Sequence, residues 1–126
     1  MIELANVVAA FDAPVSITKQ RYSVKVLEDC IQLQNKKSQD YQNAISSVKQ
    51  ADYYPHGITT IYDIMWAKML RIKSVMDVMK SGGKQNFESL GDSAMDLINY
   101  SSFFVAYLEG NVDGQKSDNN CFNEPS

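Results

Sequence analysis

The chain has 126 residues, 44% of them hydrophobic, so it is long enough for one compact core and too short for two ordinary domains. Its 12 basic and 15 acidic residues are well mixed and give a formal net charge of -3. The chain therefore has no large basic surface that could bind along a phosphate backbone, which argues against duplex nucleic acid as a partner. The two cysteines, Cys30 and Cys121, suggest neither a disulfide framework nor a thiolate metal site, so we expect a cytoplasmic protein.

The amino-terminal arm, residues 1–15, contains an apolar run without a basic region before it, which is not typical of a signal peptide. No stretch reaches the roughly 18 to 20 apolar residues that a membrane-spanning helix needs. We therefore expect a soluble protein without a membrane partner.

Helical periodicity predicts an all-α domain over residues 16–110. Its three main helices are expected at about residues 16–50, 61–80 and 87–108. Ser16 is the expected cap of the first helix. Proline and glycine residues between the segments end one helix and allow the next to begin.

Residues 111–126 are rich in Asn, Asp, Gly and Ser, and they bury too little apolar surface to offset the entropy of ordering them. We expect a disordered polar tail. The rest predicts a helical bundle, because all its elements are helical and its connections are short. Three amphipathic helices leave an apolar face uncovered, so dimerisation is expected to complete the bundle, with a homodimer or larger homo-oligomer as the result.

Lys68 interrupts the apolar stripe of the second helix that is expected to face the core. The stripe is formed by residues at steps of three, four and seven: Ile61, Ile64, Met65, Met69, Ile72, Val75, Met76 and Met79. A lysine taken out of water without a partner costs several kcal/mol. The sequence thus predicts an acidic side chain or a bound anion beside Lys68.

The third helix carries polar residues at one per turn along a single stripe, Glu88, Asp92, Asp96 and Asn99. One interpretation is the solvated side of an ordinary amphipathic helix, whose core side would be formed by Phe87, Leu90, Ala94, Ile98, Ser101 and Val105. The other is a functional site, because stacked like charges repel unless a cation neutralises them.

Two kinds of cation are candidates for that role. Mg²⁺ (or Mn²⁺) suits an oxygen-rich site, and Glu88, Asp92 and Asp96 are its predicted ligands. Lys68, with Arg71 one turn later, is the other candidate. It pairs with Asp92 or Asp96 as a structural bridge, or it holds the phosphates of a nucleotide.

Several segments together resemble the phage-associated nucleotide modification associated domain 1 family. They are residues 37–41 (Lys-Ser-Gln-Asp-Tyr), residues 61–64 running into 68–73 (Lys-Met-Leu-Arg-Ile-Lys), Glu88 through Asp92, and residues 96–100 (Asp-Leu-Ile-Asn-Tyr). The resemblance spans residues 34–108, and its last segment is the most specific. It implies a phage-type nucleotide-handling protein in the host cytoplasm.

More distantly, the stacked acids resemble those of the all-α nucleotide pyrophosphohydrolases, MazG-like and dimeric dUTPase-like, which use Mg²⁺ to release pyrophosphate from nucleoside triphosphates. The chain departs from their pattern, since its second helix offers Asp63 alone and its third spaces Glu88 and Asp92 four apart. In this reading Lys68, Arg71 and Asp96 are the catalytic residues, and the nucleotide contacts are made by Asp40, Tyr41, Trp66 and Asn99.

Three functional hypotheses follow. The first is a Mg²⁺-dependent nucleoside triphosphate pyrophosphohydrolase, in which the metal orients a water and the basic residues stabilise developing charge. The second is a non-catalytic module that binds a nucleotide or a nucleotide-derived signal in the same place. The third is a helical interaction protein whose Lys68 is bridged internally.

Overall fold

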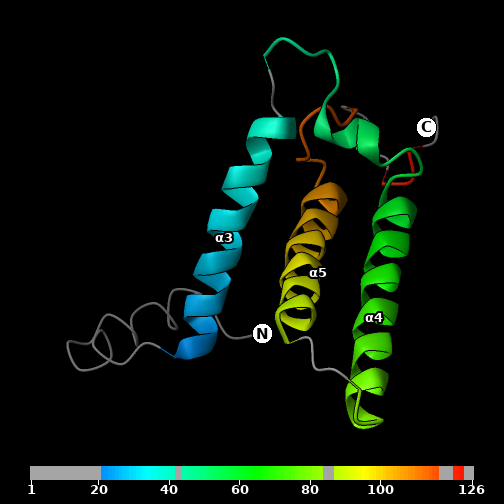
Figure 1. Cartoon of the computed structure of the whole chain (residues 1–126). Helices are drawn as coiled ribbons and strands as arrows, with labels where there is room; N and C mark the ends of the chain where they lie inside the picture. Colours follow the sequence, from blue (N-terminus) through cyan, green and yellow to red (C-terminus); the bar gives the residue numbers. More distant parts are fainter. Residues whose placement is uncertain (1–20, 42–43, 84–86, 117–120, 124–126) are drawn as a thin grey trace, which may run out of the picture.

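A computed structural model of the chain describes residues 21–41, 44–83, 87–116 and 121–123, without the side chains of residues 40, 41, 87 and 88. Within these ranges it contains no strand, and its elements are α3 (Tyr22–Tyr41), the short 3-10 helix η1 (Gln50–Tyr53), α4 (Ile58–Lys80) and α5 (Phe87–Leu108). Helix α5 lies between α3 and α4, and it packs more extensively on α4 (Figure 1). The expected all-α architecture with three main helices is confirmed, and dimerisation stays a prediction.

No helix in the described part of the chain combines the length and the apolar character needed to cross a membrane.

The first helix is shorter than expected, because α3 ends at Tyr41 rather than near Gln50. Local side-chain hydrogen bonds hold the following segment in a non-helical path. The Val48 amide donates to Ser46 Oγ (3.0 Å) and the Lys49 amide to Asp52 Oδ2 (2.8 Å). Such bonds compete with the helical ladder and favour turns. The predicted cap at Ser16 lies outside the described residues.

The second and third helices lie close to their expected bounds. Helix α4 begins three residues earlier than expected, at Ile58, and the amide of His56 donates to Thr60 Oγ1 (2.9 Å) across its first turn. Helix α5 has the bounds that the sequence predicts. Glycines with positive φ follow both helices, Gly82 (82°) after α4 and Gly110 (75°) after α5. This left-handed conformation costs glycine little and commonly ends a helix.

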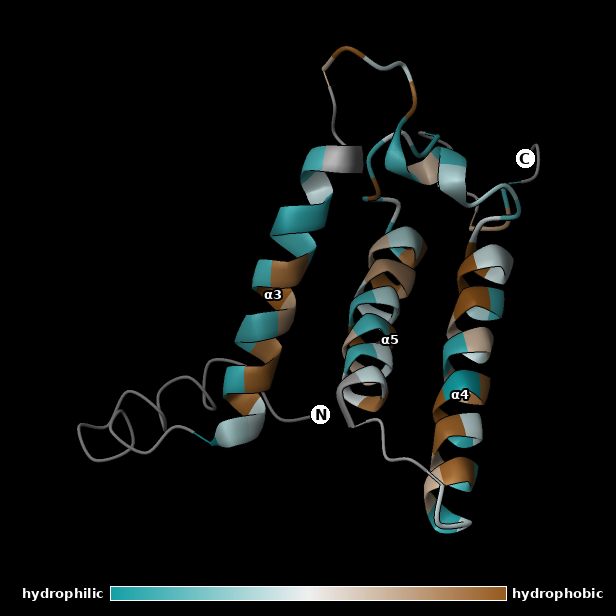
Figure 2. Ribbon diagram, viewed as in Figure 1, coloured by the Kyte–Doolittle hydropathy of each residue, from teal (hydrophilic) through white to brown (hydrophobic). Residues whose placement is uncertain are grey.

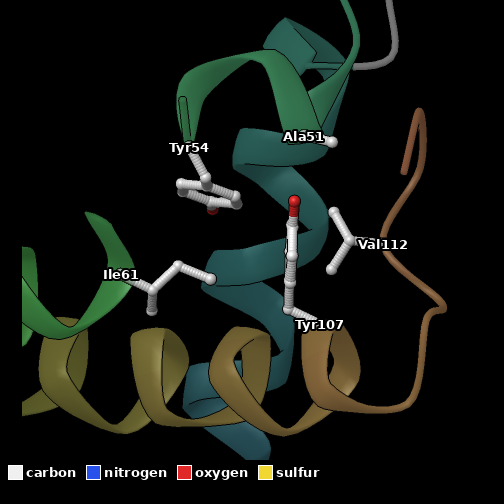
Figure 3. Packing of buried hydrophobic residues seen from close by; sticks show 5 residues of the cluster. All are labelled: Ala51, Tyr54, Ile61, Tyr107 and Val112. Atoms are coloured by element: carbon white, nitrogen blue, oxygen red, sulfur yellow. The ribbon is translucent and has the colours of Figure 1, made fainter. Parts of the chain in front are cut away.

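The buried core lies at one end of the bundle, where α4 begins and α5 ends. Its residues come from η1 and the residue that follows it, both helices and the segment after α5, and they are Ala51, Tyr54, Ile61, Tyr107 and Val112 (Figure 3). The rings of Tyr54 and Tyr107 meet edge to face, with centroids 6.2 Å apart. Aromatic pairs in this geometry contribute about 0.5–1.5 kcal/mol beyond their buried area.

A disordered tail was expected after α5, but the residues of this segment that the structure describes pack onto the core. Val112 is buried, and the amide of Ala51 donates to the Asp113 carbonyl (2.9 Å). Further along, Tyr107 Oη donates to Asn123 Oδ1, and Asn123 Nδ2 donates to the Tyr54 carbonyl (2.8 Å). Val112 and Cys121 contribute apolar contacts to this attachment, and polar and backbone groups supply the rest, which apolar content did not predict.

The carboxyl-terminal segment approaches the start of α4 closely at Gly57. The φ of this glycine is 61°, and a Cβ here would clash with the carbonyl group of Cys121, which accepts the Ile58 amide (2.8 Å). Gly82 also has positive φ, yet nothing lies within 4 Å of the Cβ it would gain.

We expect Gly57→Ala to lower the free energy of unfolding by roughly 3 kcal/mol or more, because backbone strain of about 1–3 kcal/mol adds to the clash. The matched Gly82→Ala has strain alone and should cost roughly 1–2 kcal/mol. Urea denaturation of both variants measures the difference. Equal losses would show that the segment around Cys121 does not dock on Gly57.

Candidate functional site

Asp96 joins the three long helices through ion pairs. Its Oδ2 lies 3.2 Å from Lys68 Nζ on α4, and its Oδ1 lies 3.4 Å from Lys37 Nζ on α3. The Asp96 side chain is 22% exposed, so these pairs are only partly shielded from water. The acidic partner predicted for Lys68 is therefore confirmed. Asp96 also pairs with Lys37, a contact that the sequence did not suggest.

Amide groups continue this polar contact one turn along α5. Asn99 is buried, with 7% of its surface exposed, and its Oδ1 accepts a hydrogen bond from Gln34 Nε2 on α3 (3.2 Å). The same Gln34 nitrogen also lies within hydrogen-bond distance of Ser102 Oγ (3.1 Å). Buried amides are stable only when they are paired in this way.

Asp96 and Asn99 of the polar stripe consequently face the other helices, and part of the expected core side of α5 faces outward. Ala94 is exposed and Val105 is 53% exposed. The interpretation of an ordinary amphipathic helix assigned these two residues to the core. Asp96 and Asn99 have side-chain partners on α3 and α4, which explains the difference. These partners offset the free-energy cost of burying the two polar side chains.

A pocket of about 200 Å³ opens between α3 and α5 beside these groups. One part of its wall is polar and the other is aromatic, where the rings of Tyr100 and Phe103 meet edge to face at 5.4 Å. The lining residues come from α3, η1 and α5, and they are Gln34, Asn35, Lys37, Ser38, Gln50, Asp96, Asn99, Tyr100 and Phe103. A ligand with a charged end and a flat apolar end matches such a wall.

Two of the predicted site residues, Asp96 and Asn99, line this pocket, and Lys68 reaches it through Asp96. Arg71 is exposed and donates from Nη2 to Ser89 Oγ (3.1 Å), two turns before Asp96. Trp66 is exposed on α4 and is not among the pocket-lining residues. The side chains of Asp40 and Tyr41 lie outside the described residues, so their nucleotide contacts stay predictions.

The structure describes the side chains of two of the three predicted metal ligands, Asp92 and Asp96, and the predicted metal site stays a prediction. No group of three His, Cys, Asp or Glu side chains in the described part of the chain lies close enough to hold an ion. Asp92 is exposed, Asp96 carries its two lysine partners, and the Glu88 side chain lies outside the description. A cation at Asp96 would compete with two ammonium groups.

Gln34, Lys37, Tyr100 and Phe103 are site residues that sequence reasoning missed. A signal existed for the residues of α5, because Asp96, Asn99, Tyr100 and Phe103 recur at helical spacing on one side. The residues of α3 had no such signal, since their polar run carries no apolar stripe that would reveal the orientation of the helix.

Cys30 is buried at the contact between α3 and α5, with its Sγ 4.0 Å from the Met95 carbonyl oxygen. Burial raises the pKa of this thiol above its usual value, and the nearby carboxylates of Asp29 and Asp96 act in the same direction. The thiol stays neutral near pH 7, so Cys30 acts as a packing residue rather than as a nucleophile.

Comparisons with protein-family models, with curated proteins and with solved structures found no match. The resemblance to nucleotide-modification proteins thus rests on the residues of the chain alone.

A double-mutant cycle on Asp96→Asn and Lys68→Met measures their ion pair. Each single change should lower the free energy of unfolding by about 1–2 kcal/mol, and the coupling between them should be about 1 kcal/mol, between the ranges for exposed and buried pairs. The exposed pair Lys25–Asp29 (3.0 Å), both on α3, is the control and should couple far more weakly. Additive effects of the Asp96 and Lys68 changes would contradict the ion pair.

Proposed function

We propose that the chain binds a nucleotide or nucleotide-derived anion in the pocket between α3 and α5. The observation that carries this proposal is the arrangement around Asp96, where two ammonium groups share a single carboxylate. The cluster therefore keeps one net positive charge beside a partly shielded pocket. An anionic group gains more from such a charge than it would in bulk water.

The pocket wall supports a nucleotide over a simple anion. Lys37 can turn from Asp96 to a phosphate, since its side chain is 51% exposed. The amides of Gln34 and Asn99 offer donors and acceptors for a sugar or a base edge. The rings of Tyr100 and Phe103 offer an apolar surface for a base, and the resemblance described above points to the same class of ligand.

Mg²⁺-dependent hydrolysis is the second candidate function. It is favoured by Asp92, which is exposed one turn before Asp96 and can contribute a carboxylate oxygen to a metal that also contacts substrate phosphates. Glu88 continues the same stripe in the sequence. When bound, the metal would polarise the phosphate and orient a water. Lys68 would hold the Asp96 carboxylate in place through their ion pair.

Isothermal titration with ribo- and deoxyribonucleoside triphosphates in EDTA tests binding without metal. We expect the wild type to bind at least one of them, and Lys37→Met to weaken the binding roughly tenfold, because a charge-assisted contact is worth about 1.5–3 kcal/mol. The matched control is Lys36→Met, which removes the same charge from the neighbouring position of α3, outside the pocket lining. Equal weakening in both variants would point to a general charge effect and contradict the pocket.

Incubation of the same nucleotides with Mg²⁺ separates the two candidates. Monophosphate and pyrophosphate formed by the wild type, and abolished in Asp92→Asn, would establish the hydrolase. Binding in EDTA without any product would establish the binding module. No binding and no product, with an unchanged melting temperature, would contradict both and favour a helical interaction protein.

A further inference from the structure

Helix α4 carries two apolar stripes side by side, and α5 covers only one of them. The first, which faces α5, is formed by Ile61, Met65, Lys68, Ile72, Val75 and Met79. The second is formed by Tyr62, Trp66, Met69, Lys73 and Met76. Both follow the alternating steps of four and three residues that pack one helix on another, and their centres lie about 100° apart around the axis. Figure 2 shows hydrophobic residues recurring along the whole of α4.

The second stripe exposes apolar surface that a compact chain normally covers. Tyr62, Trp66, Met69, Met76 and the adjoining Leu70 are 39% to 56% exposed. At roughly 200 Å² for a large apolar side chain, these five leave about 500 Å² uncovered. A standard interface buries about 800 Å² on each partner, of which about 500 Å² is apolar. The stripe alone thus supplies the apolar part of one ordinary interface.

An apolar hollow lies at the amino-terminal end of the same stripe. It has a volume of about 220 Å³ and is lined by Ile58, Thr59, Tyr62, Phe104 and Phe122. Phe104 belongs to α5, so the surface continues from α4 onto its neighbour. A hollow of this kind at the end of a stripe suits an inserted side chain from a second helix.

We propose that a second copy of this chain covers the stripe, with the two α4 helices antiparallel about a twofold axis near Met69 and Leu70. In this antiparallel pairing, the stripe of one copy meets the same stripe of the second copy in reverse order, and the residues that meet are complementary. Trp66 lies opposite Lys73 of the second copy, where an ammonium over an indole ring is favourable, and both pairs form at once because the interface is isologous.

The same register fills the hollow. Tyr62 lies opposite Met76 of the second copy, whose flexible side chain is suited to enter an apolar recess. Lys73, the only charged residue of the stripe, already pairs with Asp77 one turn along α4 (2.5 Å), so the second copy brings Trp66 beside an ammonium that keeps its own carboxylate partner.

Sedimentation equilibrium of the full chain at about 1–100 µM tests the pairing, since a modest standard interface dissociates in this range. We expect a wild-type dimer, and a rise of more than about tenfold in the dissociation constant for Trp66→Glu. The matched control is Val78→Glu. Val78 lies on the same helix and is 48% exposed, but it points away from the stripe, so this variant should dissociate like the wild type.

Disulfide cross-linking checks the register independently of any loss of folding. In a Cys121→Ser background, Met69→Cys should cross-link two copies under mild oxidation because it lies near the twofold axis, whereas Val78→Cys should not. A monomeric wild type at the highest concentration would overturn the proposal. So would a dimer that Val78→Glu disrupts as strongly as Trp66→Glu, or one in which Met69→Cys does not cross-link.

Discussion

The carboxylate of Asp96 is the interaction on which the arrangement of the three helices depends. It forms one ion pair with α3 and one with α4, so a single side chain of α5 links both neighbouring helices. Two cations on one anion leave a net positive charge. The same group that brings the helices together therefore makes the adjoining pocket attractive to an anion, which links the fold to the proposed function.

The sequence predicted the number of helices, two of their three spans and the acidic partner of Lys68, because periodicity and the cost of an unpaired lysine are local signals. It did not predict which side of α5 faces inward. A helical wheel separates Asp96 and Asn99 from Ala94 and Val105, but the choice between the two sides depends on Lys37 and Gln34 of α3, and no local pattern reveals that they are near. The attachment of the carboxyl-terminal segment was missed for a similar reason, since it rests on Gly57 and Asn123 rather than on an apolar stripe.

The two surfaces proposed for function have opposite chemistry. The pocket is bounded by α3, η1 and α5 and combines charge with amides, whereas the second stripe of α4 is largely apolar. On α4, Lys68 belongs to the stripe that faces α5 and not to the second stripe, and its ammonium points to Asp96. Ligand binding and pairing of two copies therefore use different residues and can be disrupted one at a time.

Nuclear magnetic resonance of the side-chain amides during titration with a nucleoside triphosphate in EDTA tests the central claim most directly. The account predicts that the amide signals of Gln34 and Asn99 shift with saturation, while those of Gln39 and Asn111, which do not line the pocket, stay in place. Unchanged signals from Gln34 and Asn99 at saturating ligand, or shifts of equal size in all four residues, would contradict a nucleotide site between α3 and α5.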